Sequence, residues 1–155
     1  ESYLVFLLMR FTARPHCMSR ILAEDYLISQ SASGGQRVEQ LRDVGDHCLL
    51  FSGLIPQLAE RRLVRISYFV NLGQSSYQQL SDQLDRGWSS VYRHLSQAFV
   101  VLMDILQAMR GLDGRPVLTP IQALDLWSDT GSRRCYEQVS ADGKVVPLAG
   151  KPDKH

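Results

Sequence analysis

The sequence lacks the features that most directly indicate a function. Its 3 cysteines are far apart, with no CxxC pair, so neither a zinc knuckle nor a disulfide framework is indicated. It contains no phosphate-binding glycine loop, nucleophile elbow or Glu-x-x-His pair. The formal net charge is +1, without the basic excess of a typical nucleic-acid binder. We therefore predict no catalytic residue, no cofactor and no metal ion.

Long apolar runs are also missing. The strongest early run, residues 3–9, is too short to span a bilayer, and Glu1 precedes it where a secretory signal would have basic residues. A small, odd number of cysteines is typical of reduced thiols in the cytoplasm. We therefore predict a cytoplasmic protein without membrane contact. Because the chain begins with Glu1 and not with methionine, we expect further residues upstream in the complete protein.

The length and composition fit one ordinary globular domain. At 155 residues, 45% of them hydrophobic and 21% charged, the chain can bury a core without disulfides or metals. The last residues contain several glycines and prolines and few apolar anchors. We therefore predict a single helical domain over residues 1–139 and a loose C-terminal tail over residues 140–155.

The clearest positive feature is the apolar segment 88–111. Its apolar residues recur at steps of three and four, the spacing of one helix face, and further apolar residues widen that face until little of the middle is polar. A helix that is apolar on most sides has to be covered by neighbours. The segment predicts an all-α fold, a single compact bundle of about six helices around a buried central helix at residues 89–110.

The same periodicity predicts the surrounding helices. Pro15 ends the first, Ser89 or Ser90 caps the central helix, and Thr119 with Pro120 begins the last, with a kink near Gly131. A helical turn is expected at residues 56–63, and the helix of segment 66–84 should begin near Ser75 after an irregular entry. The other expected helices are 3–13, 20–29, 36–52 and 120–139.

One group of residues has the composition of an interaction surface. Arginines next to aromatic side chains with polar tips are enriched where proteins contact each other. An ordinary core edge has the same composition, so both interpretations stay open. We predict a non-enzymatic binding or regulatory module that contacts a protein partner or a second copy of itself as a homodimer. The candidate surface is Arg61, Arg62, Arg65, Tyr68, Phe69 and Tyr77.

Segment 77–95 supports an alternative function, because it resembles a helix-turn-helix DNA reader. Asp85 stands where that motif usually has glycine, and His94 stands where a leucine or isoleucine is usual. Few positive side chains are expected on the outer face of the second helix, so DNA binding is possible but not favoured. The residues that would contact DNA are Ser89, Ser90, Tyr92, Arg93 and His94.

A second alternative is a ligand- or metal-binding bundle. Asp43, Asp46 and His47 share one face of the predicted helix 36–52, and carboxylate and imidazole groups at such spacing can hold a metal inside a bundle. The apolar stripe of that helix lies on the opposite face. We therefore expect these three residues to face water.

Residues 41–80 resemble a segment of a family of uncharacterised proteobacterial helical proteins. The resemblance depends on LRDVGD, on Phe51-x-Gly53 before Pro56, and on SYFVNLG followed by Tyr77. It covers about a quarter of the chain and implies a bacterial origin. No activity is assigned to the family, so the resemblance implies no site residues.

Overall fold

The structure, a computed structural model, confirms the all-α class for the part of the chain that it describes. The described residues are 2–13, 27–28, 30–31, 33–57, 64–114 and 117–141. Within these ranges the regular structure is helical, and no strand occurs. Most of the expected helix 20–29, most of the turn 56–63 and nearly all of the expected tail 140–155 lie outside the described residues.

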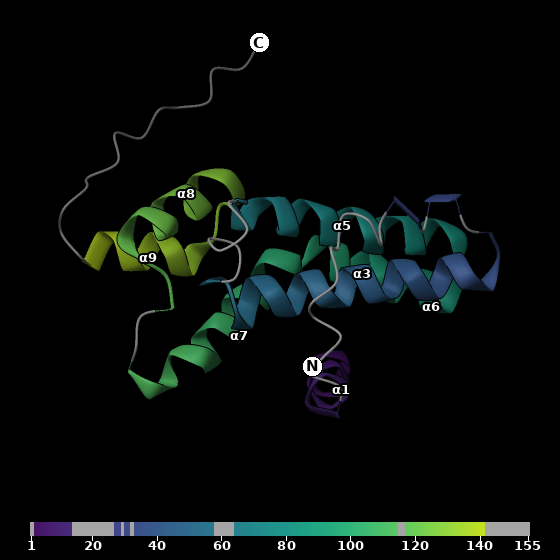
Figure 1. The fold of residues 1–155 in the computed structure, drawn as a ribbon, viewed down its shortest axis with the longest axis horizontal. Coiled ribbons are helices and arrows are strands. Elements are labelled where there is room, and N and C mark those ends of the chain that lie inside the picture. Colours follow the sequence, from purple (N-terminus) through teal and green to yellow (C-terminus); the bar gives the residue numbers. More distant parts are fainter. Residues whose placement is uncertain are drawn as a thin grey trace, which may run out of the picture.

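Helix α3 (Gly35–Leu54) contains the longest nearly continuous run of buried residues among the described helices. It packs against α5 (Ile66–Gln83) and α7 (Phe99–Arg110), and Figure 1 shows α3 and α5 side by side along the long axis. The second half of α3 is buried on nearly every side, at Leu41, Val44, Gly45, Asp46, Cys48, Leu49, Leu50, Phe51, Ser52 and Gly53. The prediction that residues 89–110 form the buried centre therefore needs correction, since α3 is more completely buried than this segment.

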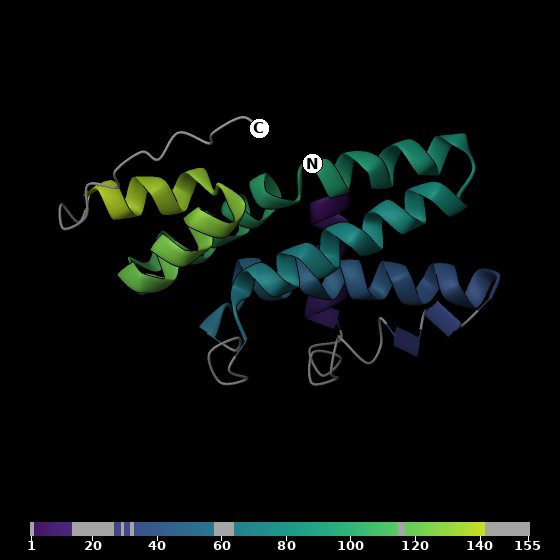
Figure 2. The ribbon, with the colours of Figure 1, turned by 90° about the horizontal axis from the view of Figure 1, so that it is seen from above.

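Two helices replace the single helix expected at residues 89–110. Helix α6 (Arg86–Gln97) begins after Asp85, so Ser89 and Ser90 lie inside it and do not cap it. The helix breaks at Ala98, and α7 follows. Figure 2 shows α6 running back beside α5, the helix against which it packs. Helix α7 buries only one side, because Val101, Ile105 and Met109 are 60%, 44% and 48% exposed.

Two glycines let the central helices approach closely. A Cβ atom added at Gly53 would lie 2.5 Å from Cβ of Leu106, where α3 meets α7. One added at Gly73 would lie 2.4 Å from the ring of Phe99, and the backbone at Gly73 is helical. Helix α5 is therefore continuous from Ile66, and the prediction of an irregular entry before Ser75 was wrong.

The last helices form a pair at one end of the bundle (Figure 1). Helix α8 (Pro120–Thr130) begins with a capping box: the side chain of Thr119 accepts a hydrogen bond from the N–H of Gln122, whose side chain accepts one from the N–H of Thr119. This confirms the predicted cap. Gly131, with φ 71°, ends α8, and α9 (Arg133–Ala141) follows, so the expected kink is a break between two helices.

Helix α1 (Ser2–Ala13) confirms the first predicted helix and runs across the bundle (Figures 1 and 2). Its inner side buries Leu7 and half-buries Tyr3, whereas Val5 and Phe6 are exposed. Among the described helices, none combines the length and the apolar character needed to cross a membrane.

Candidate functional site

The predicted interaction surface is divided between the surface and the core. Tyr68 is 44% exposed, but Phe69 and Tyr77 are 4% and 0% exposed, so placing these two residues on a surface was wrong. Phe69 packs on Phe51 with ring centroids 4.5 Å apart. Exposed Arg65 lies 3.5 Å from Asp129 of α8, an ordinary surface ion pair. The remaining two members, arginines 61 and 62, lie outside the described residues.

The predicted DNA-contact residues are divided in the same way. Ser90, Arg93 and His94 are exposed, and Ser89 is half-buried, with its hydroxyl 3.4 Å from that of Ser81. Tyr92 is 5% exposed and belongs to the core, so its predicted contact with DNA was wrong. Helices α5 and α6 lie beside each other as a hairpin (Figure 2), whereas a DNA-reading pair crosses at a steep angle.

Asp46 is the residue that sequence reasoning placed most wrongly. It was expected to face water, yet it is 4% exposed and accepts hydrogen bonds from two tyrosine hydroxyls. The hydroxyl of Tyr3 on α1 donates at 2.6 Å and that of Tyr77 on α5 donates at 2.8 Å, both to Oδ1. Tyr92 of α6 completes an aromatic group, its ring centroid 6.1 Å from that of Tyr3 and 5.9 Å from that of Tyr77. This tyrosine cluster joins α1, α3, α5 and α6.

The tyrosine cluster is suited to holding helices together. Burial, reinforced by the nearby Asp46 carboxylate, raises the pKa of Tyr3 and of Tyr77. Burial also raises the pKa of Tyr92, and hydrogen bonding with Tyr3 partly opposes that rise. All three hydroxyls therefore hold their protons at neutral pH. A buried carboxylate bonded to two such donors has the satisfied geometry of a structural network.

The free energy of unfolding should fall as the pH rises above about 10, where an unfolded tyrosine ionises. Folded Tyr3 and Tyr77 keep their protons at that pH, so the unfolded state binds fewer protons than the folded state. Each such tyrosine should lower the free energy of unfolding by about 1.4 kcal/mol per pH unit. Urea unfolding at several pH values between about 9 and 11.5 measures how the free energy of unfolding changes with pH. Tyr77→Phe should make this change smaller by the contribution of one proton. An unchanged slope in that variant would contradict the assignment.

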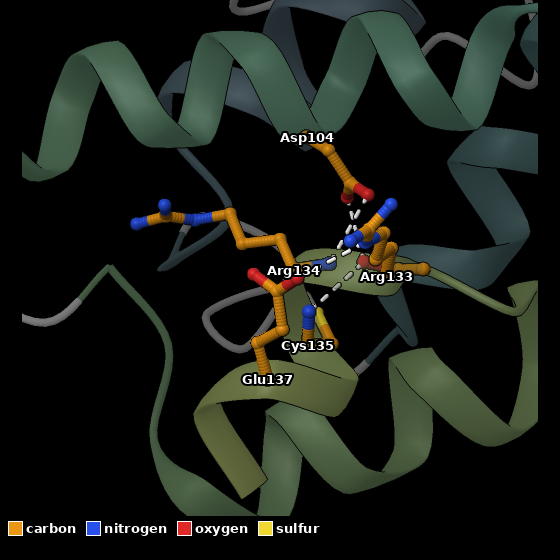
Figure 3. Close-up of polar contacts among 6 residues, drawn as sticks. Asp104, Arg133, Arg134, Cys135 and Glu137 are labelled. Carbon is orange, nitrogen blue, oxygen red and sulfur yellow. Dashed lines mark hydrogen bonds and ion pairs between the residues drawn. The ribbon is translucent and has the colours of Figure 1, made fainter. Parts of the chain in front are cut away.

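A second polar group fixes α9 against α7 (Figure 3). Asp104 of α7 accepts a 2.6 Å hydrogen bond from the Ser132 hydroxyl and a 3.4 Å bond from the N–H of Arg134, at the start of α9. The Ser132 hydroxyl in turn accepts a bond from the N–H of Cys135 at 3.2 Å. A carboxylate at a helix N-terminus accepts hydrogen bonds from free N–H groups and interacts favourably with the helix dipole. These hydrogen bonds therefore explain the polar group by its role in holding α9 against α7.

The remaining side of α7 forms an apolar stripe on the surface. Phe99, Met103 and Leu106 face the core, and Asp104 faces α9. The side away from both carries only apolar residues, which continue into the short 3-10 helix η2 (Gly111–Asp113), where Leu112 is 86% exposed. We call this set the outer stripe: Val101, Ile105, Ala108, Met109 and Leu112, all of them exposed.

Comparison with known proteins adds no assignment. The chain matches no protein-family model, no curated protein and no solved structure. The resemblance of residues 41–80 to uncharacterised proteobacterial proteins thus gains no support, and it implied no activity. Among the described residues, no group of three or more histidine, cysteine or acidic residues could hold a metal ion. The exposed apolar residues also include Val5, Phe6 and Met9 of α1, but the outer stripe is the longer of the two apolar surfaces.

Proposed function

We propose that this protein is a helical binding module that acts through protein–protein contacts, with the outer stripe as its contact surface. The observation that carries the proposal is the absence of any polar residue on the outward side of α7, where a surface helix normally carries its polar face. Four side chains at 44% to 86% exposure give an apolar patch on the order of 400 Å², a size at which monomer patches are often functional.

This proposal keeps the class of function expected from the sequence but moves the surface. Phe69 and Tyr77 are core residues, and Arg65 is paired with Asp129. The outer stripe instead runs along α7 into η2, and Val101, Ile105, Ala108 and Leu112 follow one another at steps of three and four residues. DNA reading is not proposed, because Tyr92 is buried and α6 lies flat against α5.

A photo-crosslinking amino acid in place of Val101, incorporated while the protein is expressed in cells, tests the proposal. We expect irradiation to give a protein adduct from this position, because the side chain is 60% exposed within the stripe. Ile121 on α8 is the matched control, since it is 74% exposed but lies outside the stripe. The adduct at Val101 should disappear when Leu112→Lys is added. Equal adducts at both positions, or none at Val101, would remove the support for a contact surface on α7.

A further inference from the structure

The residue spacing of the outer stripe matches that of a helix-pairing seam. Val101, Ile105, Ala108 and Leu112 follow one another at steps of four, three and four residues, and all are exposed. These are the steps at which the seam of a two-helix coil repeats. Met109 lies at the edge of this seam and adds apolar area. The stripe therefore has the shape that another α-helix fits.

The electrostatics of α7 favour a neutral partner. The carboxylate of Asp104 is bonded to Ser132, and the amide of Gln107, 0% exposed, donates to the Ser52 carbonyl at 3.0 Å. Both side chains are thus turned away from the stripe. Arg110, the remaining polar residue of α7, follows Met103 and Leu106 at steps of three and four and so lies on their side of the helix. The residues of the stripe itself are uncharged. A charged partner helix would lose hydration here without gaining an ion pair. An identical stripe is neutral along its whole length and carries no such cost.

The order of large and small side chains also suits a second copy. Two copies of the α7–η2 segment in antiparallel orientation, centred between Leu106 and Gln107 in the sequence, would place Ile105 opposite Ala108 and Val101 opposite Leu112. The large Ile105 would then face a small residue, which lets the two helices approach closely. Parallel pairing would place Ala108 opposite itself and leave a gap. Antiparallel helices also have opposed dipoles, which attract.

We infer that the outer stripe pairs with the outer stripe of a second copy of this chain, α7 against α7, antiparallel about a twofold axis. This inference rests on the proposed function and names its partner. Two stripes would together bury on the order of 800 Å² of apolar side chain, somewhat below the lower end of the area of stable specific interfaces. The dimer should therefore be reversible and form at micromolar or higher concentration.

Sedimentation equilibrium from about 1 to several hundred micromolar tests the pairing, a range suited to an interface of this size. We expect the average mass to rise from one chain to two. Val101→Lys should weaken dimerisation at least about tenfold, since it places a charge in the seam. At about 1 micromolar, where both proteins are monomeric, its circular dichroism and melting temperature should equal those of the wild type. Ile121→Lys, on an exposed position outside the stripe, should leave dimerisation unchanged. A monomer at every concentration, or a dimer that Val101→Lys does not weaken, would overturn the inference.

Cysteine crosslinking tests the orientation in a Cys17→Ser background, in which the described cysteines, Cys48 and Cys135, are buried. A chain carrying Ile105→Cys mixed with one carrying Ala108→Cys should give the mixed disulfide in excess over either homodimer. Homodisulfides formed mainly through position 108 would show parallel pairing and overturn the antiparallel arrangement.

The photo-crosslinking experiment separates the two proposals. If the chain is monomeric but position 101 still captures a different protein, the second copy is wrong and the binding module stands. If the chain is monomeric and position 101 captures nothing, both proposals fail.

Discussion

Replacing Gly53 with alanine should lower the free energy of unfolding by about 3 kcal/mol, or prevent folding altogether. The added Cβ would lie 2.5 Å from Cβ of Leu106, an atom that no side-chain rotation can move. Helices α3 and α7 would therefore have to separate, and the core contacts of α7 would loosen along with them. Urea unfolding followed by circular dichroism measures the loss.

Gly87→Ala is the matched control for Gly53→Ala. Gly87 lies in the first turn of α6, and a Cβ atom there would meet nothing within 4 Å. Alanine forms helices better than glycine by up to about 1 kcal/mol, so this variant should be as stable as the wild type or slightly more stable. If both variants lost the same stability, the loss would be a general effect of adding a methyl group to a helix, and the close approach of α3 to α7 would not be its cause.

Replacing Asp46 with alanine should cost about 3 kcal/mol of unfolding free energy, because two buried hydroxyls would lose their acceptor. Leaving the Tyr77 hydroxyl without an acceptor should cost more than leaving that of Tyr3, since Tyr77 is 0% exposed and donates its 2.8 Å hydrogen bond to the Asp46 carboxylate. Tyr3 would lose its bond to α3 as well, so contacts between α1 and the bundle should weaken. Chemical unfolding gives the overall cost, and hydrogen exchange in residues 2–13 reports the release of α1.

Asp46→Asn provides the control, because the amide keeps one oxygen that can accept hydrogen bonds from Tyr3 and Tyr77. We expect this variant to lose clearly less stability than Asp46→Ala. Equal losses would show that the charge of Asp46, and not its role as acceptor, stabilises the cluster. Wild-type stability in Asp46→Ala would show that the tyrosines find other partners.

Local patterns predicted much of the helical structure. The apolar run before Pro15 gave α1, the stripe through Leu41, Val44 and Cys48 gave α3, and Thr119 with Pro120 gave the start of α8. These signals lie within a few residues of the feature that they predict, so no knowledge of tertiary packing is needed.

The errors lie where distant residues decide the outcome. The irregular entry predicted before Ser75 is absent, because the missing side chain of Gly73 makes room for Phe99, and that packing outweighs the roughly 1 kcal/mol that glycine costs a helix. The break at Ala98 has no local signal, because alanine is the best helix former. Asp46 was expected in water because its two partners are 43 and 31 residues away in the sequence.

The candidate surface shows a different limit of the sequence. The pattern identified segment 88–111 as apolar on most sides, but it could not tell which side the chain itself covers. The structure covers the side of Phe99 and Met103 and leaves that of Val101 and Ile105 exposed. The arginine–aromatic surface failed for the same reason, since Tyr68 and Phe69 are neighbours in sequence and only one of them is exposed.

The two buried thiols allow the opening of the fold to be timed. Cys48 lies at the centre of α3 and Cys135 in α9, both are 0% exposed, and burial raises the pKa of each. An alkylating reagent can reach either sulfur only when its surroundings open. The labelling rates of the two cysteines therefore distinguish local opening of the α8–α9 pair from collective unfolding. A faster rate at Cys135 would mean that this pair detaches first. Equal rates would mean that the helices holding both cysteines open as one cooperative unit.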